Sequence, residues 1–298
     1  LCRNAAPMHD AREYDAVIAS GEQVTAGLLA IALQERGIPA RSWQGWQVPI
    51  KTDGVHGAAR ISEIEAGEIR KRMEQGQVAV LTGFQGIGPD RRITTLGRGG
   101  SDTTAVALAA ALRADVCEIY TDVAGVFSAD PRIVPSARKL TQVSFEEMLE
   151  MSASGAGVLQ LRSVEYARNH GVRIHCRSSF EDGPGTLVVA EDQTMENPFV
   201  TAVTHSNAEA RVTLTGVRDE PGVAGKIFSA LAGSNVNVDM IIQNEPVSHD
   251  GGADLSFTVE SDDVQTAVEV IEGLDAAGIE QEITTRQALL AGKKIVAG

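Results

Sequence analysis

The sequence has few cysteines, no recognisable metal-binding pattern and no long apolar run. Its three cysteines, Cys2, Cys117 and Cys176, are odd in number and show no metal or redox spacing. The six histidines form no HxH or HxxxH pair, so a zinc site is not expected. No stretch reaches the roughly 18 consecutive apolar residues of a membrane helix, and no signal peptide opens the chain. We therefore expect a cytoplasmic protein with no membrane partner, in which Cys117 and Cys176 are core residues of strands.

Positive charge is also scarce. The 298 residues include 26 Lys and Arg against 40 Asp and Glu, which gives a net charge of −14. Such a balance argues against nucleic acid or an anionic membrane as a partner. It leaves room for a small anionic ligand, because Arg91, Arg92 and Arg98 can reverse the field locally. The length predicts two domains rather than one.

Helical and strand-like patterns alternate over the first 190 residues. This alternation predicts a three-layer α/β sandwich with a largely parallel sheet. Ligands of such sheets bind at the carboxyl ends of the strands, where the glycine-rich segments after Thr82 and Tyr120 fall. The expected helices are 21–36, 63–75, 101–113, 145–151 and 158–169, and the expected strands are 77–82, 115–120, 172–177 and 186–189.

A second unit follows a segment rich in glycine, proline and acidic residues, Glu181–Asn197. We place a linker at 191–200, with one domain at 1–190 and another at 201–298. The second domain shows strands at 211–215, 236–242, 253–260 and 279–283, and helices at 222–232 and 263–276. This βαββαβ order predicts a ferredoxin-like fold.

The run Thr94–Thr104, TTLGRGGSDTT, is the most informative stretch of the chain. Its three glycines allow backbone N–H groups to converge on an anion, and the helix that follows directs its positive end toward the same point. Arg98 supplies a planar guanidinium suited to a carboxylate or phosphate. Asp102 places a carboxylate beside it. A capped glycine loop without function is the simpler alternative, but it does not account for all these parts in order.

The segment TTLGRGGSDTTA resembles the substrate-binding signature of aspartate kinases, members of the amino acid kinase superfamily. The resemblance continues through Cys117–Arg132, SFEEMLEM at 144–151 and LRSVEYA at 161–167, and covers nearly the whole chain. It implies an amino acid kinase sandwich over 1–190, with its N-terminal part missing. It also implies an ACT domain over 201–298, ending in the first strand of a second ACT unit at 294–296. Both ends of the chain look cut.

The implied reaction transfers the γ-phosphoryl group of ATP to the β-carboxylate of L-aspartate. The product, 4-phospho-L-aspartate, begins the route toward lysine, threonine and methionine. Mg²⁺ is expected with ATP, held largely by phosphates and water, and no protein ligand can be assigned to it. The resemblance further implies feedback by lysine or threonine, and a homo-oligomer or α/β assembly formed through ACT domains.

The resemblance assigns substrate-site roles by position. Glu22 matches the acid near the aspartate ammonium group, although a glutamate in the first turn of a helix is a common dipole partner. Asp102 matches the carboxylate that orients the catalytic lysine, with a plain helix-start acid as the alternative. The catalytic residues are thus Asp102 and Arg98, and the substrate-binding residues are Glu22, Arg98, Gly99, Gly100 and Ser101.

Two further groups of residues match ligand contacts of the family. The expected nucleotide contacts are Thr121, Asp122, Phe127, Asp130 and Arg132, with a simple turn as the alternative for the last two. The expected allosteric residues are Asp219, Pro221, Gly222, Asn237, Asp239 and Gln243, with a purely oligomerising unit as the alternative.

The sequence departs from the family pattern in two places. The Lys-x-Gly-Gly-Thr/Ser motif, which supplies the catalytic lysine, does not occur among the 298 residues. Gly157 stands where the family usually has a lysine near the ATP phosphates, so the role of that lysine could pass to Arg162 or Lys139. Two alternative functions therefore stay open. One is another amino acid kinase, such as a glutamate, acetylglutamate, carbamate or uridylate kinase, and the other is an amino-acid-sensing regulatory protein with an inactive kinase-like domain.

Overall fold

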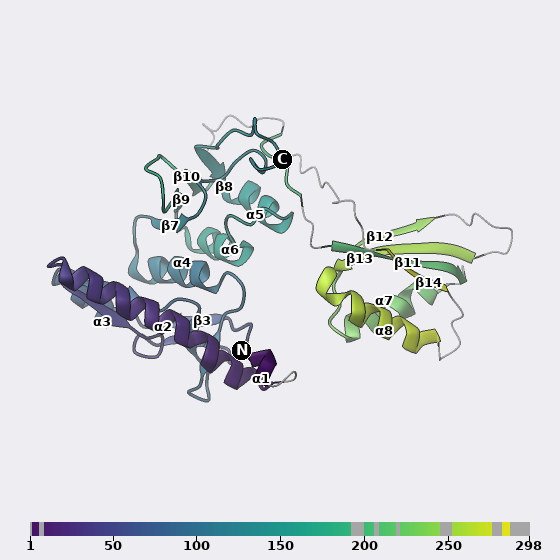
Figure 1. Ribbon diagram of the computed structural model, residues 1–298, viewed down its shortest axis with the longest axis horizontal. Helices are drawn as coiled ribbons and strands as arrows, with labels where there is room; N and C mark the ends of the chain where they lie inside the picture. Colours follow the sequence, from purple (N-terminus) through teal and green to yellow (C-terminus); the bar gives the residue numbers. More distant parts are fainter. Residues whose placement is uncertain are drawn as a thin grey trace. The chain divides into compact units, whose positions relative to one another are not determined.

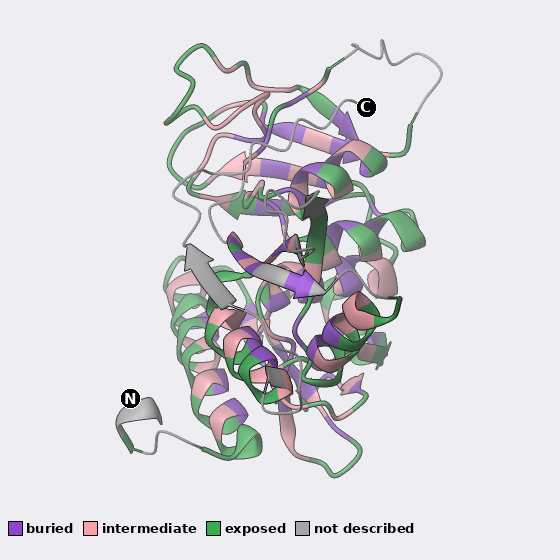
Figure 2. Ribbon diagram, turned by 90° about the vertical axis from the view of Figure 1, so that its right-hand side faces the viewer, coloured by how far each residue is buried: buried purple, intermediate pink, exposed green. Residues whose placement is uncertain are grey.

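The chain folds into two compact units, the first ending at Thr204 and the second beginning at His205. The computed structural model describes residues 2–5, 9–191, 200–205, 209–218, 221–244, 252–275 and 282–286 (Figure 1). Most of the expected linker, and the expected strand at 294–296, lie outside these residues. Figure 2 shows that buried and exposed residues alternate along the helices, so each helix turns one face toward a core.

The first unit begins with the short helix α1, Cys2–Ala5, and the long helix α2, Ala11–Glu35. Asp10 caps α2 by accepting a hydrogen bond from the Arg12 N–H, which fixes the start ten residues before the predicted one. The glycine at 21 misled the prediction, because a glycine inside a helix weakens it without ending it. Glu22 consequently lies in the middle of α2, which removes its alternative role as a first-turn dipole partner.

Helix α2 is apolar on more than one face. Its core-facing side buries Asp15, Ala19, Ala26 and Ala30. By length and composition it could cross a membrane, which the sequence analysis did not predict: an 18-residue window has a mean hydropathy of 1.6, and 17% of that window is buried. This is weak evidence, because the core helix of a globular protein passes the same test.

Short strands build the sheets beside α2. Strands β1, Ala40–Trp43, and β4, Val78–Leu81, pair in parallel. A mixed sheet has the order β3-β2-β5-β6. Its strands have only three or four residues each, too few for a periodic signal, so the sequence analysis missed them. They are β2 Ile50–Thr52, β3 Ile61–Ile64, β5 Gln85–Ile87 and β6 Ile93–Thr95, and helix α3 spans Gly67–Glu74.

The rest of the first unit is a four-stranded sheet with three helices. Its order is β7-β9-β10-β8, in which β7/β9 and β10/β8 are parallel and β9/β10 is antiparallel. The predicted α/β class with parallel strands is confirmed. The strands are β7 Cys117–Thr121, β8 Gln142–Ser144, β9 Ile174–Ser178 and β10 Thr186–Val189, and the helices are α4 Gly100–Leu112, α5 Phe145–Ala153 and α6 Leu161–His170.

The core of this sheet includes both strand cysteines, as predicted. Cys117 and Cys176 are free and buried, and they pack against apolar side chains of the helices. Burial raises the pKa of each thiol to about 11, with the nearby Asp102 carboxylate adding to the effect. Both groups are therefore protonated at neutral pH and serve packing rather than nucleophilic chemistry.

The segment before the second unit is anchored to the first. The Thr201 hydroxyl donates to the Glu147 carboxylate at 2.6 Å, and the Val203 N–H donates to the Ser128 carbonyl oxygen at 2.9 Å. Ala202 between them is buried in the core of the sheet. Residues 201–203 thus contact both the start of α5 and the segment that follows β7.

The second unit has the predicted βαββαβ order. It consists of β11 Glu209–Arg218, α7 Val223–Gly233, β12 Val238–Asn244, β13 Gly252–Glu260, α8 Val264–Asp275, which follows a 3₁₀ turn, and β14 Glu282–Arg286. All strand pairs are antiparallel, in the order β12-β13-β11-β14. Ile227 and Leu231 of α7 and Ile271 of α8 are buried against this sheet, which confirms the ferredoxin-like fold.

Candidate active site

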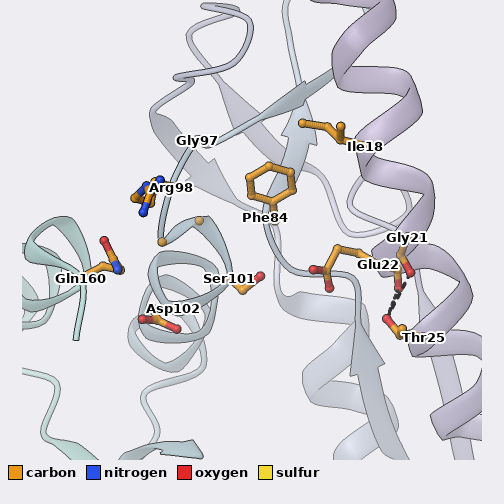
Figure 3. A pocket seen from close by; sticks show the side chains of 12 residues that line it. Ile18, Gly21, Glu22, Thr25, Phe84, Gly97, Arg98, Ser101, Asp102 and Gln160 are labelled. Carbon is orange, nitrogen blue, oxygen red and sulfur yellow. Dashed lines mark hydrogen bonds between the residues drawn. The ribbon is translucent and has the colours of Figure 1, made fainter. Parts of the chain in front are cut away.

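One pocket of about 560 Å³ gathers the residues predicted to bind and activate the substrate (Figure 3). It lies between α2, the loop after β4, the glycine loop after β6, the start of α4 and the residue that precedes α6. Six lining residues were predicted from the sequence, namely Glu22, Arg98, Gly99, Gly100, Ser101 and Asp102. They come from two segments almost 80 residues apart in the sequence, and the fold brings them together.

The glycine loop has a backbone shape that side chains would prevent. Gly97 and Gly99 have φ values of 76° and 70°, in the left-handed region that favours glycine. A Cβ at Gly99 would collide with the Gln160 side chain, and a Cβ at Gly97 would lie 2.8 Å from the Gly57 carbonyl oxygen. The loop therefore packs closely on both neighbours and leads directly into α4, whose first three residues line the pocket.

The pocket holds the positive side chain of Arg98 and the negative side chain of Glu22 on different walls, with Asp102 at the start of α4 as its third ionisable side chain. Arg98 is exposed on the glycine loop, and Glu22 is half-buried on α2. Within the described part of the chain, neither side chain has a hydrogen-bonded or ion-paired partner. Figure 3 shows Glu22 pointing from α2 toward Ser101 at the start of α4, with Arg98 and Gln160 on the opposite side of the Phe84 ring. A ligand with a carboxylate and an ammonium group would match this arrangement.

Asp102 occupies the first turn of α4, where its carboxylate is partly buried. Burial raises its pKa, and the backbone N–H of Gln160, which donates to the carboxylate, opposes this effect in part. A carboxylate held at such a cost is typical of a functional group.

The two walls of the pocket are fixed by buried polar contacts. The Gln85 side chain, on β5, donates to the Ala19 carbonyl oxygen of α2 at 3.2 Å. Arg162 of α6 donates to the carbonyl oxygens of Leu96 at 2.5 Å and Ala59 at 2.9 Å. Arg162 is thus occupied in holding the glycine loop, which argues against its replacing the family's lysine at the phosphates.

Four other pocket residues were missed by the sequence analysis. They are Ile18 and Thr25 on α2, Phe84 before β5, and Gln160 before α6. Phe84 carried a signal in the sequence, because it lies in the motif GFQG directly after the predicted strand 77–82. In the structure it has a φ of 69°, an uncommon conformation for an aromatic residue. Ile18 could be found only once the helix was known to begin at Ala11, whereas Thr25 lies within the predicted helix, one turn after Glu22.

The predicted nucleotide contacts lie elsewhere, on the segment that follows β7. Thr121 ends β7 and donates from its hydroxyl to the Asp122 carboxylate at 3.1 Å. Asp130 accepts from the Arg132 backbone at 2.9 Å and from its guanidinium group at 3.1 and 2.9 Å. Phe127 is half-buried and pairs with Lys139 through a β-bridge. None of these five residues is among those that line the pocket, and their roles stay predictions.

The predicted allosteric residues are only partly described. Gly222 precedes α7 with a φ of 95°, and the exposed Pro221 comes just before it. Asn237 and Asp239 are exposed at the beginning of β12, which starts one residue after Asn237. Asp219 lies outside the described residues, as does the side chain of Gln243. A ligand site in this unit therefore also stays a prediction.

The described residues include no group of three or more His, Cys, Asp or Glu side chains that could hold a metal ion. Asp102 is the only carboxylate that the pocket offers beside Glu22. The pocket therefore fits a metal that enters with phosphate ligands better than a resident metal ion, which would need a full set of protein donors.

Comparison with known proteins places this geometry in a family. The profile of the amino acid kinase family matches residues 3–178, more than half of the chain, and that of an ACT domain matches residues 212–273. The aspartokinase of Mycobacterium tuberculosis (strain ATCC 25618 / H37Rv) is 50% identical over 277 residues, 92% of this chain. This chain spans 66% of that relative's length.

Two solved structures of Escherichia coli aspartokinase III have the same fold. One, in complex with aspartate and ADP (R-state), has a TM-score of 0.75 and 27% identity over 95% of this chain and 64% of that one. The other, with lysine and aspartate (T-state), has a TM-score of 0.72 and 27% identity over 95% and 63%. Family profile, sequence relatives and fold agree, and the chain belongs to the amino acid kinase family, with an ACT domain following its kinase unit.

Proposed function

We propose that this chain carries the substrate site of an aspartate kinase, which transfers the γ-phosphoryl group of ATP to the β-carboxylate of L-aspartate. The observation that carries the proposal is the pocket that pairs Arg98 and the start of α4 with Glu22 on the facing helix. Aspartate has two carboxylates and one ammonium group, so it matches both walls. The identity of 50% with an aspartokinase supports the choice of substrate.

The proposed roles follow the chemistry of phosphoryl transfer, in which positioning and charge neutralisation supply most of the rate enhancement. Arg98 binds a substrate carboxylate, Ser101 and the N–H group of Gly99 bind the same end, and Glu22 binds the ammonium group. Gly100 lines that end, while its own N–H donates to the Gly97 carbonyl oxygen at 3.0 Å. Asp102 orients the reacting groups. Arg98 and Asp102 are thus the catalytic residues of this proposal.

ATP would bind beside the segment that follows β7. The proposed contacts are Thr121, Asp122, Phe127, Asp130 and Arg132. ATP would bring Mg²⁺ with it, held by phosphate oxygens and water, because the pocket supplies no complete set of metal ligands. Exposed, locally paired side chains such as Arg132 can turn toward a bound triphosphate at small cost.

The second unit is proposed to sense an end-product amino acid, lysine or threonine, and to assemble with other ACT units. The start of α7 after Pro221 and Gly222 would receive the ligand carboxylate. Asp219, Asn237, Asp239 and Gln243 would complete the site. The complex of the similar Escherichia coli aspartokinase III with lysine supports this choice of effector. The corresponding domains would be 1–190, a linker at 191–200, and 201–298.

The test is ATP-dependent formation of aspartyl hydroxamate by the full-length protein, with hydroxylamine present to trap the acyl phosphate. We expect product with L-aspartate, and none with L-glutamate, N-acetylglutamate or carbamate, or when ATP is omitted. Product with one of the other acceptors would identify a different amino acid kinase. No product with any acceptor, together with lysine or threonine binding, would instead favour a regulatory protein with an inactive kinase-like unit.

A further inference from the structure

Asp15 is a fully buried carboxylate on α2 that the predicted chemistry does not use. Its Oδ1 accepts a hydrogen bond from the Thr95 hydroxyl at 2.5 Å. Its Oδ2 accepts from the Thr95 N–H at 3.1 Å and the Gly57 N–H at 3.2 Å, and lies 2.7 Å from His56 Nδ1. A buried carboxylate is costly unless all its oxygens are hydrogen-bonded, and here both are.

The partners of Asp15 adjoin the glycine loop, which forms the opposite wall of the pocket. Thr95 is the last residue of β6, three positions before Arg98. The carbonyl oxygen of Gly57 lies directly against Gly97, where it would be 2.8 Å from an added Cβ. The carboxylate is therefore hydrogen-bonded to both segments that adjoin the glycine loop, the end of β6 at Thr95 and the turn at Gly57.

Asp15 itself belongs to the wall that carries Glu22. The two residues are seven positions apart on α2, or about 10 Å along the helix axis. The rest of the buried face of this helix is alanine, which packs without directional contacts. Asp15 is thus the buried charged group through which α2 is bonded to the strand that leads to Arg98, whereas the Glu13–Arg92 ion pair just before that strand is exposed to solvent.

We propose that Asp15 is a positioning residue for the amino-acid substrate: it sets the separation between Glu22 and Arg98 by bonding α2 to Thr95 and to the turn at His56 and Gly57. This inference rests on the proposed function, because it requires a ligand that touches both side chains. A ligand clamped at two ends is sensitive to their separation, and a displacement of about 1 Å can cost up to a hundredfold.

A purely structural role predicts a different result, so a matched control is needed. Thr52 of β2 and Thr94 of β6 share a buried hydroxyl–hydroxyl hydrogen bond of 2.8 Å in the same sheet. The substitution Thr52→Val removes this bond one residue away from Thr95 but leaves every contact of Asp15 in place. Both Asp15→Asn and Thr52→Val should lower the melting temperature.

The experiment measures the KM for aspartate and for ATP in the full-length protein, at a temperature at which all variants are folded. Asp15→Asn should raise the aspartate KM by about tenfold to a hundredfold and leave the ATP KM within about twofold. Thr52→Val should leave both KM values within about twofold. An unchanged aspartate KM in Asp15→Asn, or an equal rise in the control, would overturn the positioning role.

A second pair of variants keeps the test decisive if Asp15→Asn does not fold. Thr95→Val removes the hydroxyl that donates to Asp15 and keeps the side-chain shape, whereas Thr95→Ser retains the hydroxyl. We expect a higher aspartate KM in the valine variant and a near wild-type value in the serine variant, and equal values would overturn the proposal. A wild-type protein that forms no aspartyl hydroxamate would refute the proposed function, and the positioning role with it, whereas an active wild type with unaffected variants refutes the positioning role alone.

Discussion

The proposed substrate pocket and the proposed nucleotide segment are built in opposite ways. The pocket takes residues from α2, the glycine loop and α4, and the buried Asp15 and Gln85, together with the half-buried Arg162, hold these parts in place. The segment after β7 holds its candidate residues mainly by contacts between near neighbours in the sequence. Arg132, for example, pairs with Asp130 two residues away and has a side chain that is 88% exposed.

This difference indicates that the pocket is preorganised for its ligand, whereas the segment after β7 is not. A small zwitterion offers few contacts, so the elements that carry its binding groups must already be in place before it arrives. ATP is larger and more highly charged, and exposed side chains can adjust to it. We therefore expect substitutions in the pocket to have large effects on aspartate, and substitutions after β7 to have small effects on ATP.

Asp102→Asn should have the largest effect. If Asp102 orients the reacting groups, its loss should lower kcat by about a hundredfold or more, which steady-state kinetics would show. A kcat within threefold of wild type would remove Asp102 from the catalytic residues.

The same substitution should also make the protein more stable. Burial raises the pKa of Asp102 above its ordinary value of 3.8, so the ionised side chain opposes folding at neutral pH. The contribution of the protonated Asp102 side chain to the free energy of unfolding is complete at pH values below the pKa in the unfolded chain. It is lost as pH rises through the pKa in the folded protein. Because the carboxylate stays partly solvated, we expect Asn to raise Tm by only about 1–2 °C at pH 7 and not at all near pH 3. Equal Tm differences at both pH values would contradict this reading.

Arg98→Ala should have the second largest effect. A bidentate pair between guanidinium and carboxylate is worth roughly 2–3 kcal/mol, so the aspartate KM should rise about 30- to 100-fold while the ATP KM changes little. Isothermal titration with aspartate alone would separate binding from turnover. An unchanged affinity would show that the substrate carboxylate is bound elsewhere.

Glu22→Gln preserves size and removes charge. Because Glu22 lies in mid-helix and has no partner within the described residues, the substitution should cost little stability but raise the aspartate KM by about tenfold. Thermal unfolding and kinetics on the same preparation would check both statements. A variant that loses stability but retains its KM would make Glu22 a structural residue.

Arg132→Ala and Gly157→Lys should have the smallest effects, both on ATP. Because Arg132 is exposed, its loss should raise the ATP KM by less than about fivefold.

Gly157 lies in a turn between α5 and α6, with nothing within 4 Å of an added Cβ, so lysine fits there without any gain in helix propensity. We expect a lysine there to lower the ATP KM by about two- to threefold, and weaker ATP binding would show that this turn is built around glycine.

Much of this organisation could be predicted from the sequence, and the failures have physical causes. The glycine loop and helix α4 were predictable because positive-φ glycines and a long apolar helix leave local signals. The start of α2 was misjudged because Gly21 resembles a helix boundary. The role of Asp15 could not be foreseen, since its partners Gly57 and Thr95 lie 42 and 80 residues away and only the folded chain brings them together.

The contrast between the pocket and the segment after β7 is tested most directly by measuring both KM values, for aspartate and for ATP, in Arg98→Ala and Arg132→Ala side by side. We predict a crossed pattern, in which Arg98→Ala raises the aspartate KM at least 30-fold with little change for ATP, and Arg132→Ala raises the ATP KM alone, by less than about fivefold. If Arg98→Ala acts mainly on ATP, the pocket does not bind aspartate. If both substitutions raise the aspartate KM, the segment after β7 is not a separate nucleotide site, and either result contradicts the account.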